Sequence, residues 1–179
     1  MKTYSCKNVT GAFACVCAAF ALLAPEQGLG ADPKSVLNAS DEKFVKAASQ
    51  MGMGEVQKAT LGVKKSARED VKAFAEKMVN DHTAANSELT ALAQAKGVSV
   101  SVVTDPKDTE TLKDLENKDT GVDFDKAFLA QVEDDHEKAV DLYQDAAEGS
   151  SDAQVKAFAA KILPALREHL NQVRELRKK

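Results

Sequence analysis

All three histidines of this 179-residue chain interrupt apolar helical seams, and a glutamate takes the matching place on a fourth seam. Along each seam the apolar residues recur at steps of three and four, which is the spacing of one buried face of an α-helix. The donor-bearing residues on these seams are His82, His136, His169 and Glu55. Four helices that each turn one nitrogen or oxygen donor inward predict a metal site in the core of a helical bundle.

The types of donor narrow the choice of metal. Three imidazoles around one point hold zinc or copper, and leave a fourth position for a carboxylate, a thioether or water. Glu55 or Glu133 would supply an oxygen and favour zinc or iron, whereas Met51 and Met78 on the same seams would favour Cu(I). Methionines on such seams are more often core filler than ligands. We therefore expect a zinc or copper ion.

A di-iron centre is not expected. Glu133 and His136 form the Glu-x-x-His pattern by which di-iron bundles take two ligands from one helix. The complete set needs that pattern on two helices, but Val79 and Leu166 stand three positions before the other two histidines. The sequence also contains no nucleophile elbow and no glycine-rich phosphate loop, so we expect a protein that is not an enzyme.

An acidic residue directly precedes every histidine, and these residues are Asp81, Asp135 and Glu168. A neighbour in sequence points about 100° away around the helix. Such a carboxylate would therefore hold the imidazole of a neighbouring helix rather than its own, or face water.

Residues 1–31 are predicted to be an export signal. Two lysines precede a charge-free apolar run at residues 9–24, which is shorter than the ~20 residues of a membrane-spanning helix. This leader holds every cysteine of the chain, Cys6, Cys15 and Cys17. The mature domain, residues 32–179, is therefore expected to be exported to the periplasm or outer envelope, without disulfides and without a transmembrane helix.

The charge of the mature domain excludes some partners. Residues 32–179 carry 22 basic and 27 acidic residues, a net charge of −5. This balance argues against nucleic acid or an anionic membrane as partner. Its 148 residues suit one domain. A protein partner is not indicated, and homo-oligomerisation stays open.

Capping signals and glycines divide the domain into helices. Ser66 and Ser151 each open a capping box, and Gly97 supplies a C-terminal stop. Pro164 should kink the last helix one turn before His169. The four predicted helices are residues 40–62, 66–97, 123–148 and 151 to near the C-terminus.

An internal repeat groups these helices in pairs. Val-Lys-Ala-Phe-Ala at residues 71–75 recurs at residues 155–159, and the same offset aligns Phe44 with Phe128 without a gap. Each half is thus predicted to be a helical hairpin that cannot bury its apolar stripe alone.

The connection at residues 97–122 sets the topology. It is far longer than a turn requires, and it could cross the ~39 Å length of a 26-residue helix. We therefore predict an all-α, ferritin-like four-helix bundle of two hairpins joined by a long crossover, with the second and third helices parallel. Within the crossover, residues 108–118 are expected to form a short helix and residues 98–103 an extended strap.

Counting residues along these helices places the three histidines within about one turn of a common level. The same count places Glu55 roughly two turns away from His82, outside the level that the three histidines share.

Three further segments carry a family resemblance. They are Val-Lys-Ala-Phe-Ala-Glu-Lys-Met-Val-Asn-Asp-His at 71–82, Phe-Asp-Lys-Ala-Phe at 124–128, and Leu-Pro-x-Leu-x-x-His-Leu at 163–170. With these motifs the chain resembles, over about residues 38–177, the exported bacterial family called domain of unknown function 4142. The resemblance implies a ferritin-like bundle in the periplasm or outer envelope and no established activity. It also implies that Glu55, His82, His136 and His169 belong to a shared site.

The leading hypothesis is a non-catalytic exported bundle that binds one transition-metal ion through the three histidines, assisted by Glu55 or Glu133. Its role would be metal handling or structural stapling. The alternative is an envelope scaffold or stress-related interaction protein whose core histidines only form hydrogen bonds. A third hypothesis is a redox enzyme with a degenerate di-iron site.

Overall fold

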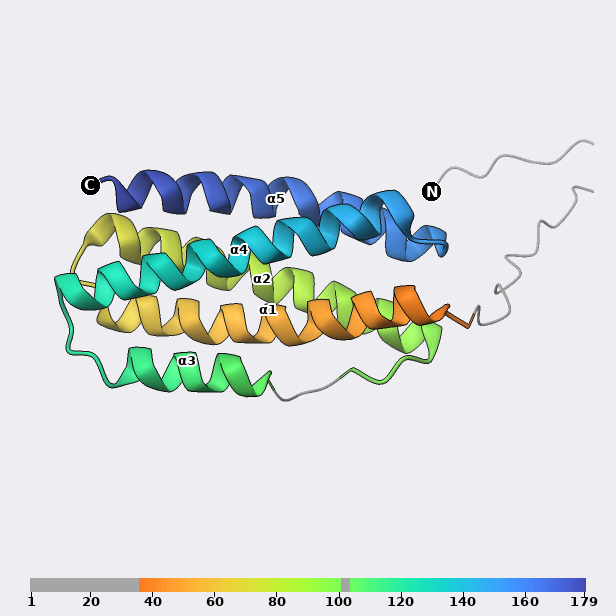
Figure 1. The fold of residues 1–179 in the computed structure, drawn as a ribbon, viewed down its shortest axis with the longest axis horizontal. Helices are drawn as coiled ribbons and strands as arrows, with labels where there is room; N and C mark the ends of the chain where they lie inside the picture. The colour runs from red at the N-terminus through yellow and green to blue at the C-terminus, as the bar shows by residue number, and fades with distance from the viewer. Residues whose placement is uncertain (1–35, 101–103) are drawn as a thin grey trace, which may run out of the picture. The chain divides into compact units, whose positions relative to one another are not determined.

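The computed structural model describes residues 36–100 and 104–179, and its regular structure in these ranges is helical (Figure 1). The helices are α1 (Ala39–Lys65), α2 (Glu69–Lys96), α3 (Pro106–Glu116), α4 (Val122–Gly149) and α5 (Ala153–Arg177). Within the described ranges no helix is long and apolar enough to cross a bilayer. The predicted signal at residues 1–31 and the end of the predicted strap, residues 101–103, lie outside the described residues.

The four long helices form a bundle of two antiparallel hairpins, α1–α2 and α4–α5. The hairpins meet along two seams, because α1 packs against α4 and α2 packs against α5. In Figure 1, α2 and α4 run in the same direction and α1 and α5 run in the opposite one. This arrangement confirms the predicted ferritin-like bundle with a long crossover.

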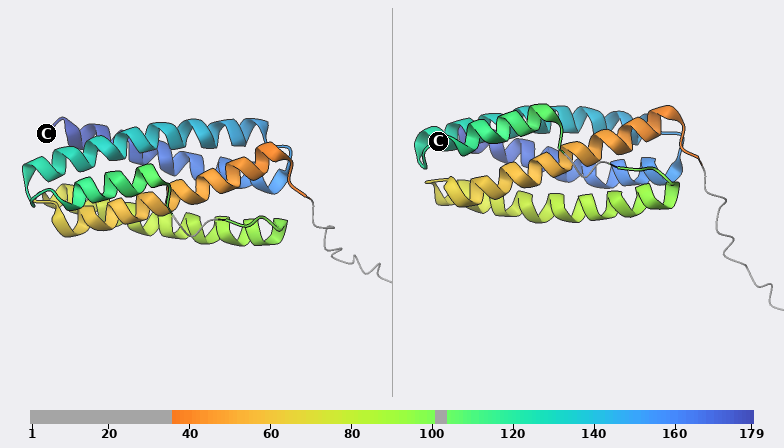
Figure 2. Two further views of the ribbon diagram at one scale, coloured as in Figure 1. Left: turned by 60° about the horizontal axis from the view of Figure 1, so that its bottom comes forward. Right: turned by 90° about the horizontal axis from the view of Figure 1, so that it is seen from below.

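The short helix α3 lies in the crossover and packs on α1 and α4, as Figures 1 and 2 show. It begins at Pro106, two residues before the predicted start, because the Asp105 side chain caps it by accepting the N–H of Lys107 at 2.8 Å. Leu115 of α3 is 3% exposed and joins the core. From α1, the Lys65 ammonium donates to backbone carbonyls at the end of α3, including that of Glu116 at 2.7 Å. The crossover is thus attached to the α1/α4 side of the bundle.

The core consists of two apolar clusters along the bundle axis. Large members of one cluster are Phe44, Leu89, Tyr143, Phe158 and Leu166. Large members of the other are Phe74, Met78, Phe124, Phe128 and Val173. On each long helix, the members of one cluster precede in sequence the predicted metal donor and the members of the other follow it. The polar donors therefore form a layer between two apolar clusters.

The start of α2 differs from the prediction. Ser66 does not open a capping box, because its N–H donates to the Gly62 carbonyl at 3.0 Å and it ends α1. The cap of α2 comes from another helix. The Asp125 carboxylate of α4 accepts the Ser66 hydroxyl at 2.5 Å and the N–H groups of Ala67 at 3.3 Å and Arg68 at 3.2 Å. The carboxylate thus satisfies backbone N–H groups at and just before the start of α2, which have no acceptor within the helix.

The repeat places an equivalent contact in the other half. Asp41 stands 84 positions before Asp125 and, like it, is buried, at 3% and 2% exposed. The Asp41 carboxylate of α1 accepts the N–H of Asp152 at 2.9 Å, at the start of α5. Asp152 rather than Ser151 then caps α5, accepting the N–H of Gln154 at 2.9 Å. The second helix of each hairpin is thus held at its start by an aspartate from the first helix of the other hairpin.

Candidate metal centre

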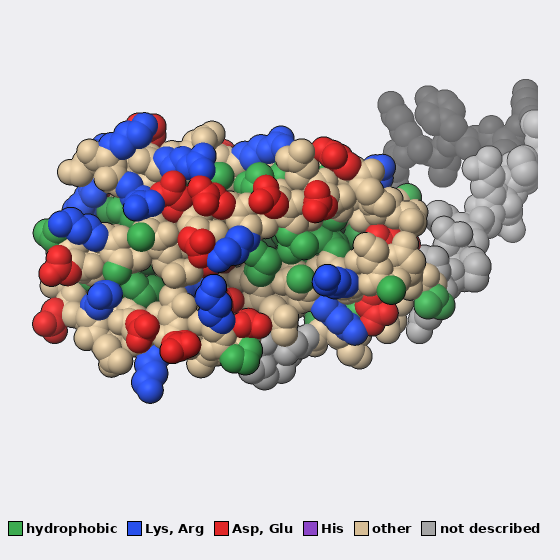
Figure 3. All heavy atoms as spheres, in the orientation of Figure 1, with side chains coloured by type: hydrophobic (Ala, Val, Ile, Leu, Met, Phe, Trp, Pro, Cys, Tyr) green, Lys and Arg blue, Asp and Glu red, His purple; other side chains and the backbone are tan. Residues whose placement is uncertain are grey.

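The structure brings the three histidines together in the polar layer of the bundle. The ring centroids of His82, His136 and His169 lie 5.3, 5.3 and 5.4 Å apart, and one nitrogen from each ring lies within 4.8 Å of the others. The residues are only 5%, 0% and 1% exposed. Figure 3 accordingly shows no histidine on the face that it presents, where acidic and basic side chains are interspersed.

Each imidazole has one nitrogen bound to an acceptor outside the cluster. Nδ1 of His136 lies 2.9 Å from the carbonyl oxygen of Val132, one turn earlier on α4. Nε2 of His169 lies 2.9 Å from the Asp81 carboxylate of α2. Carbonyl and carboxylate oxygens only accept hydrogen bonds, so these contacts favour the imidazole proton on Nδ1 of His136 and on Nε2 of His169, where the Lys77 ammonium also lies 3.1 Å from that Nε2.

His82 follows the same rule. Its Nδ1 lies 2.9 Å from Oε2 of Glu55, and its buried Nε2 has no hydrogen-bond partner. When the rings are neutral in these tautomers, the lone pairs lie on the three remaining nitrogens, Nε2 of His82, Nε2 of His136 and Nδ1 of His169. Those of His136 and His169 lie 3.4 Å apart. Two lone pairs at this distance repel each other unless a cation or a proton lies between them.

Glu55 is brought to the cluster, against the sequence-based count that placed it two turns from His82. The count assumed a turn near residue 64, but α1 continues to Lys65 and α2 begins at Glu69. The turn is thus centred near residue 67, so Glu55 is level with about residue 79 of α2, within one turn of His82. Its second oxygen, Oε1, lies 3.6 Å from Nδ1 of His136. Glu55 therefore orients the His82 ring, while its buried Oε1 lies near His136 without a hydrogen-bond partner.

Glu133 is not brought to the cluster. Its carboxylate accepts from Arg174 at 3.1 Å and from Arg177, both on α5. A position three residues before His136 points about 60° away around α4, and here that direction faces the basic last turns of α5. Burial alone would raise the pKa of Glu133, but the arginine hydrogen bonds outweigh burial and hold this pKa below its usual value. The physical reason for the difference from the prediction is thus a competing pair of guanidinium groups.

The methionines lie in the apolar clusters rather than among the polar donors. Met78 is fully buried in one cluster, and Met51 packs against the other. This placement fits the reading of both residues as core filler.

The three acids that precede a histidine were each expected to hold an imidazole of a neighbouring helix or to face water. Only one of them holds an imidazole. Asp81 of α2 binds His169 of α5. Asp135 instead pairs with Lys58 at 2.7 Å, and Glu168 lies 3.8 Å from the Lys77 ammonium.

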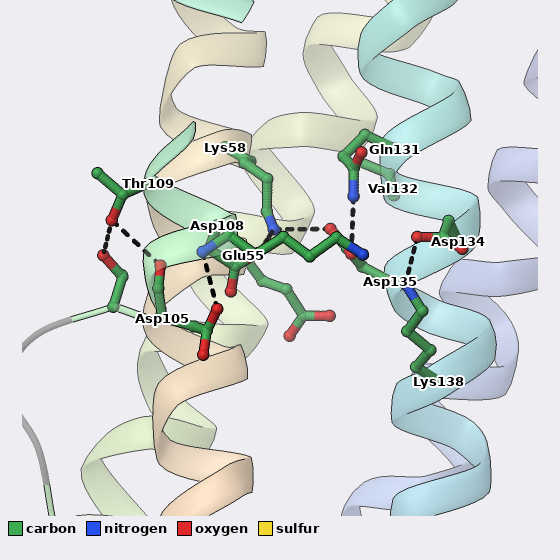
Figure 4. Close-up of polar contacts among 12 residues, drawn as sticks. Glu55, Lys58, Asp105, Asp108, Thr109, Gln131, Val132, Asp134, Asp135 and Lys138 are labelled. Atoms are coloured by element: carbon green, nitrogen blue, oxygen red, sulfur yellow. Dashed lines mark hydrogen bonds and ion pairs between the residues drawn. The ribbon is translucent and has the colours of Figure 1, made fainter. Parts of the chain in front are cut away.

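A buried ion network beside the cluster was not predicted (Figure 4). Lys58 of α1 is 2% exposed, and its ammonium lies 2.6 Å from Asp108 of α3 and 2.7 Å from Asp135 of α4. Burial alone would lower the pKa of Lys58, but the two carboxylates outweigh burial and raise it. Lys58 is one turn from Glu55, and its position beside a seam is the only sign of this role in the sequence.

The charge states in the cluster follow from burial and from Glu55. Burial lowers the pKa of His169 to about 4 and also lowers the pKa of His136. Burial would lower the pKa of His82 too, but the Glu55 carboxylate raises it above its usual value. Burial would raise the pKa of Glu55, but His82 and His136 lower it to about 2. At neutral pH His136 and His169 are thus uncharged, the state that binds metal ions.

Solved structures share this fold at low sequence identity. A DUF305 fragment from Deinococcus radiodurans matches with a TM-score of 0.69 and 14% identity, over 79% of this chain and 97% of that one. CopM in its Cu(I)-bound form matches with a TM-score of 0.65 and 15% identity, over 77% and 95%. A putative spore coat protein from Bacillus halodurans C-125 matches with a TM-score of 0.63 and 13% identity, over 79% and 88%. At these identities the likeness shows the fold alone.

Two comparisons concern the sequence itself. No curated protein matches the chain. A family model described as "Domain of unknown function (DUF4142)" matches residues 26–176. This match covers all four donor positions, His82, His136, His169 and Glu55.

Proposed function

Because the chain belongs to the DUF4142 family, whose description names no activity, we propose a function from the site itself: the protein binds one transition-metal ion. The ligands are Nε2 of His82, Nε2 of His136 and Nδ1 of His169. We further propose that the protein is exported and that it holds the ion for metal handling or for stability, without catalysing a reaction.

The observation that carries this proposal is the placement of the ring nitrogens. Each ring has one nitrogen against an oxygen acceptor on its outer side, and the inner nitrogens of His136 and His169 face each other at 3.4 Å. A buried, unpartnered Nε2 of His82 completes the set. A bound cation would satisfy all three nitrogens at once, and three imidazoles leave a fourth position for water or another ligand.

Copper is the preferred ion and zinc the alternative. Cu²⁺ binds a given set of nitrogen ligands more tightly than the other divalent ions of the first transition series. A neighbour of the same fold, CopM, has been solved with Cu(I) and with Cu(II) bound, which supports copper. Zinc has no geometric preference of its own and would accept the same three nitrogens.

The test is metal binding by untagged protein, measured by calorimetry and elemental analysis with Cu²⁺ and Zn²⁺ in turn. We expect one ion per chain for the wild type and none when His82, His136 and His169 are all changed to alanine. Glu133→Gln is the matched control, since Glu133 was a predicted ligand that the structure pairs with arginines, and it should bind like the wild type. Absence of bound metal in the wild type, or equal binding by the triple variant, would reject the proposal.

One observation favours a second candidate, a scaffold whose histidines only form hydrogen bonds. The Lys77 ammonium lies 3.1 Å from Nε2 of His169. If Lys77 donates to that nitrogen, the ring proton lies on Nδ1, and the contact between His136 and His169 becomes an ordinary hydrogen bond. Thermal unfolding separates the two functions. An ion at about 100 times its Kd stabilises a binding protein by about 2.7 kcal/mol and raises its Tm, whereas the scaffold's Tm would not change.

A further inference from the structure

The two apolar clusters block access to the histidines along the bundle axis, so an ion can reach them only from the side of the bundle. Along the bundle axis, one apolar cluster lies on one side of the polar layer and the second cluster lies on the other side. The helices within each hairpin are joined by a short turn and pack together along their length. An ion must therefore pass between the two hairpins, along either the α1/α4 seam or the α2/α5 seam.

The α1/α4 seam is blocked at the Lys58 network, although a surface hollow of about 340 Å³, lined in part by Asp108 and Asp135, lies beside it. The helix α3 lies over it (Figures 1 and 2), and Lys58 is fixed there between Asp108 and Asp135. The Lys58 side chain is only 3% exposed, so this cation has no solvent to move into. In the part of the chain that the structure describes, no helix covers the α2/α5 seam in the same way.

At the α2/α5 seam a second lysine lies over His169 and remains exposed. The Lys77 ammonium lies 2.7 Å from the Asp81 carboxylate, 3.1 Å from Nε2 of His169 and 3.8 Å from the Glu168 carboxylate. These three atoms are of the types that bind transition metals. The Lys77 side chain is 39% exposed, and its flexible stem can swing outward.

A surface groove extends along this seam to Lys77. A shallow groove of about 440 Å³ follows the α2/α5 seam, with Phe74 and Lys77 in its wall. The Phe74 ring packs edge-on against the His169 ring, with centroids 6.1 Å apart. Lys77 thus lies between the groove and the outer nitrogen of His169, and the inner nitrogen of that ring lies in the cluster.

We propose that the ion enters and leaves through the α2/α5 seam, where Asp81 and then Nε2 of His169 bind it first and Lys77 occupies that place in its absence. The inference rests on the proposed function. When the ion takes Nε2, the ring proton moves through water from Nε2 to Nδ1. When the ion passes on to the inner nitrogens, the proton returns to Nε2 and leaves Nδ1 free to bind the ion. Lys77 is therefore a gate whose ammonium must leave before the ion can pass.

The test is the rate of metal uptake and release in the full chain, followed by stopped-flow absorbance with a chromogenic chelator and Cu²⁺. Lys77→Gln should raise both rates on the order of tenfold, because no ammonium then has to leave before the ion can pass in either direction, and should change Kd by less than about threefold. Simple charge repulsion without a gate would speed uptake alone. Asp81→Asn should slow uptake by a similar factor.

Two matched controls locate the route. Lys161→Gln removes an exposed lysine that pairs with Glu88 elsewhere on the same seam, and Asp108→Asn loosens the cover of the other seam. Both should keep wild-type rates. If Lys77→Gln has wild-type rates, or if Asp108→Asn is the faster variant, the proposed route is wrong while the binding site stands. If the wild type binds no ion at equilibrium, the route and the proposed function both fall.

Discussion

Three histidines of one type are held in three different ways in this protein. His82 is bound by the Glu55 carboxylate of another helix, and His136 by a backbone carbonyl of its own helix. His169 is bound by the partly exposed Asp81 carboxylate. A carboxylate partner makes an imidazole a stronger ligand than a carbonyl partner does, because it stabilises positive charge on the ring. The outer partners, as much as the rings, should therefore set the affinity for metal.

Glu55→Gln tests this at His82. The amide keeps the volume of the side chain and removes its charge. We expect metal affinity to fall about 10–100-fold, measured by competition with a chelator of known Kd, while the stoichiometry stays at one ion. Glu133→Gln is the control, because it makes the same substitution at a glutamate that does not contact the histidines. Unchanged affinity in Glu55→Gln would show that this carboxylate does not act on the site.

The metal-free protein should lose stability as the pH falls from about 6.5 to about 4. The pKa of His169 is lowered from 6.5 to about 4 in the folded chain, so over this window the unfolded chain takes up a proton that the folded chain does not. The loss should be on the order of 1–3 kcal/mol, measured by urea unfolding at several pH values. Glu55, with its pKa lowered from 4.5 to about 2, adds a further loss below about pH 4.5.

His82 shifts in the opposite direction, since its pKa is raised and its contribution is lost as the pH rises. The pKa of His136 is lowered like that of His169, so His169→Gln removes only the part of the effect that belongs to His169. Its stability should depend less on pH between 6.5 and 4 than that of the wild type. An equal dependence in both proteins would contradict the assignment to His169.

At the scale of the helices, most of the fold could be predicted because apolar periodicity reports which face is buried. The four long helices, the short crossover helix and the stop at Gly97 follow from such local signals. The cap of α2 could not be found in this way. Ser66 has the local pattern of a cap, but the partner that holds the helix start is Asp125, 57 to 59 positions away. The same limit applies to Glu133, whose arginine partners lie on another helix.

Asp125→Ala should therefore destabilise the protein by about 2 kcal/mol or more, because it leaves a hydroxyl and two N–H groups at the start of α2 without their acceptor. Asp41→Ala is the repeat-related comparison and removes the acceptor of the Asp152 N–H. Urea unfolding should show a loss in both variants and the larger loss for Asp125. A loss below about 0.5 kcal/mol for Asp125→Ala would contradict the capping role.

Gly62 allows α1 to approach its neighbours closely. A methyl group there would lie 2.6 Å from the Phe128 ring of α4 and 3.0 Å from Ala75 of α2. We expect Gly62→Ala to cost about 1–3 kcal/mol by overpacking, measured by urea unfolding. Gly149→Ala is the control, because nothing lies within 4 Å of its added methyl group. Equal stability of the two variants would show that the helices can separate without cost.

At the scale of the whole molecule, the two seams between the hairpins differ although the hairpins are related by a repeat. One seam carries α3 and the buried Lys58 network, and the other carries the exposed Lys77. The donor positions also break the repeat, since the offset of 84 pairs His136 with Gly52 and His169 with Ala85. The residues that follow the repeat thus form the core of the bundle, whereas the metal donors stand at positions that do not follow it.

Asp108→Asn should free α3 without unfolding the bundle. It weakens the contact between α3 and Lys58, while Asp135 still pairs with that lysine. Hydrogen exchange of the amides of residues 106–116 should become at least several-fold faster, and protection in α2 and α5 should not change. Uniform loss of protection along all helices would mean that the crossover helix is part of the cooperative core.

The exchanged aspartates, Asp41 and Asp125, also bear on how the chain is made. When α1 and α2 leave the ribosome, the amides at the start of α2 still lack their acceptor, which arrives only with α4 about 60 residues later. A lone half should remain largely unstructured during synthesis, and order should spread through both halves in one step. Two separately produced halves should then complement each other when mixed, each supplying the carboxylate that the other lacks.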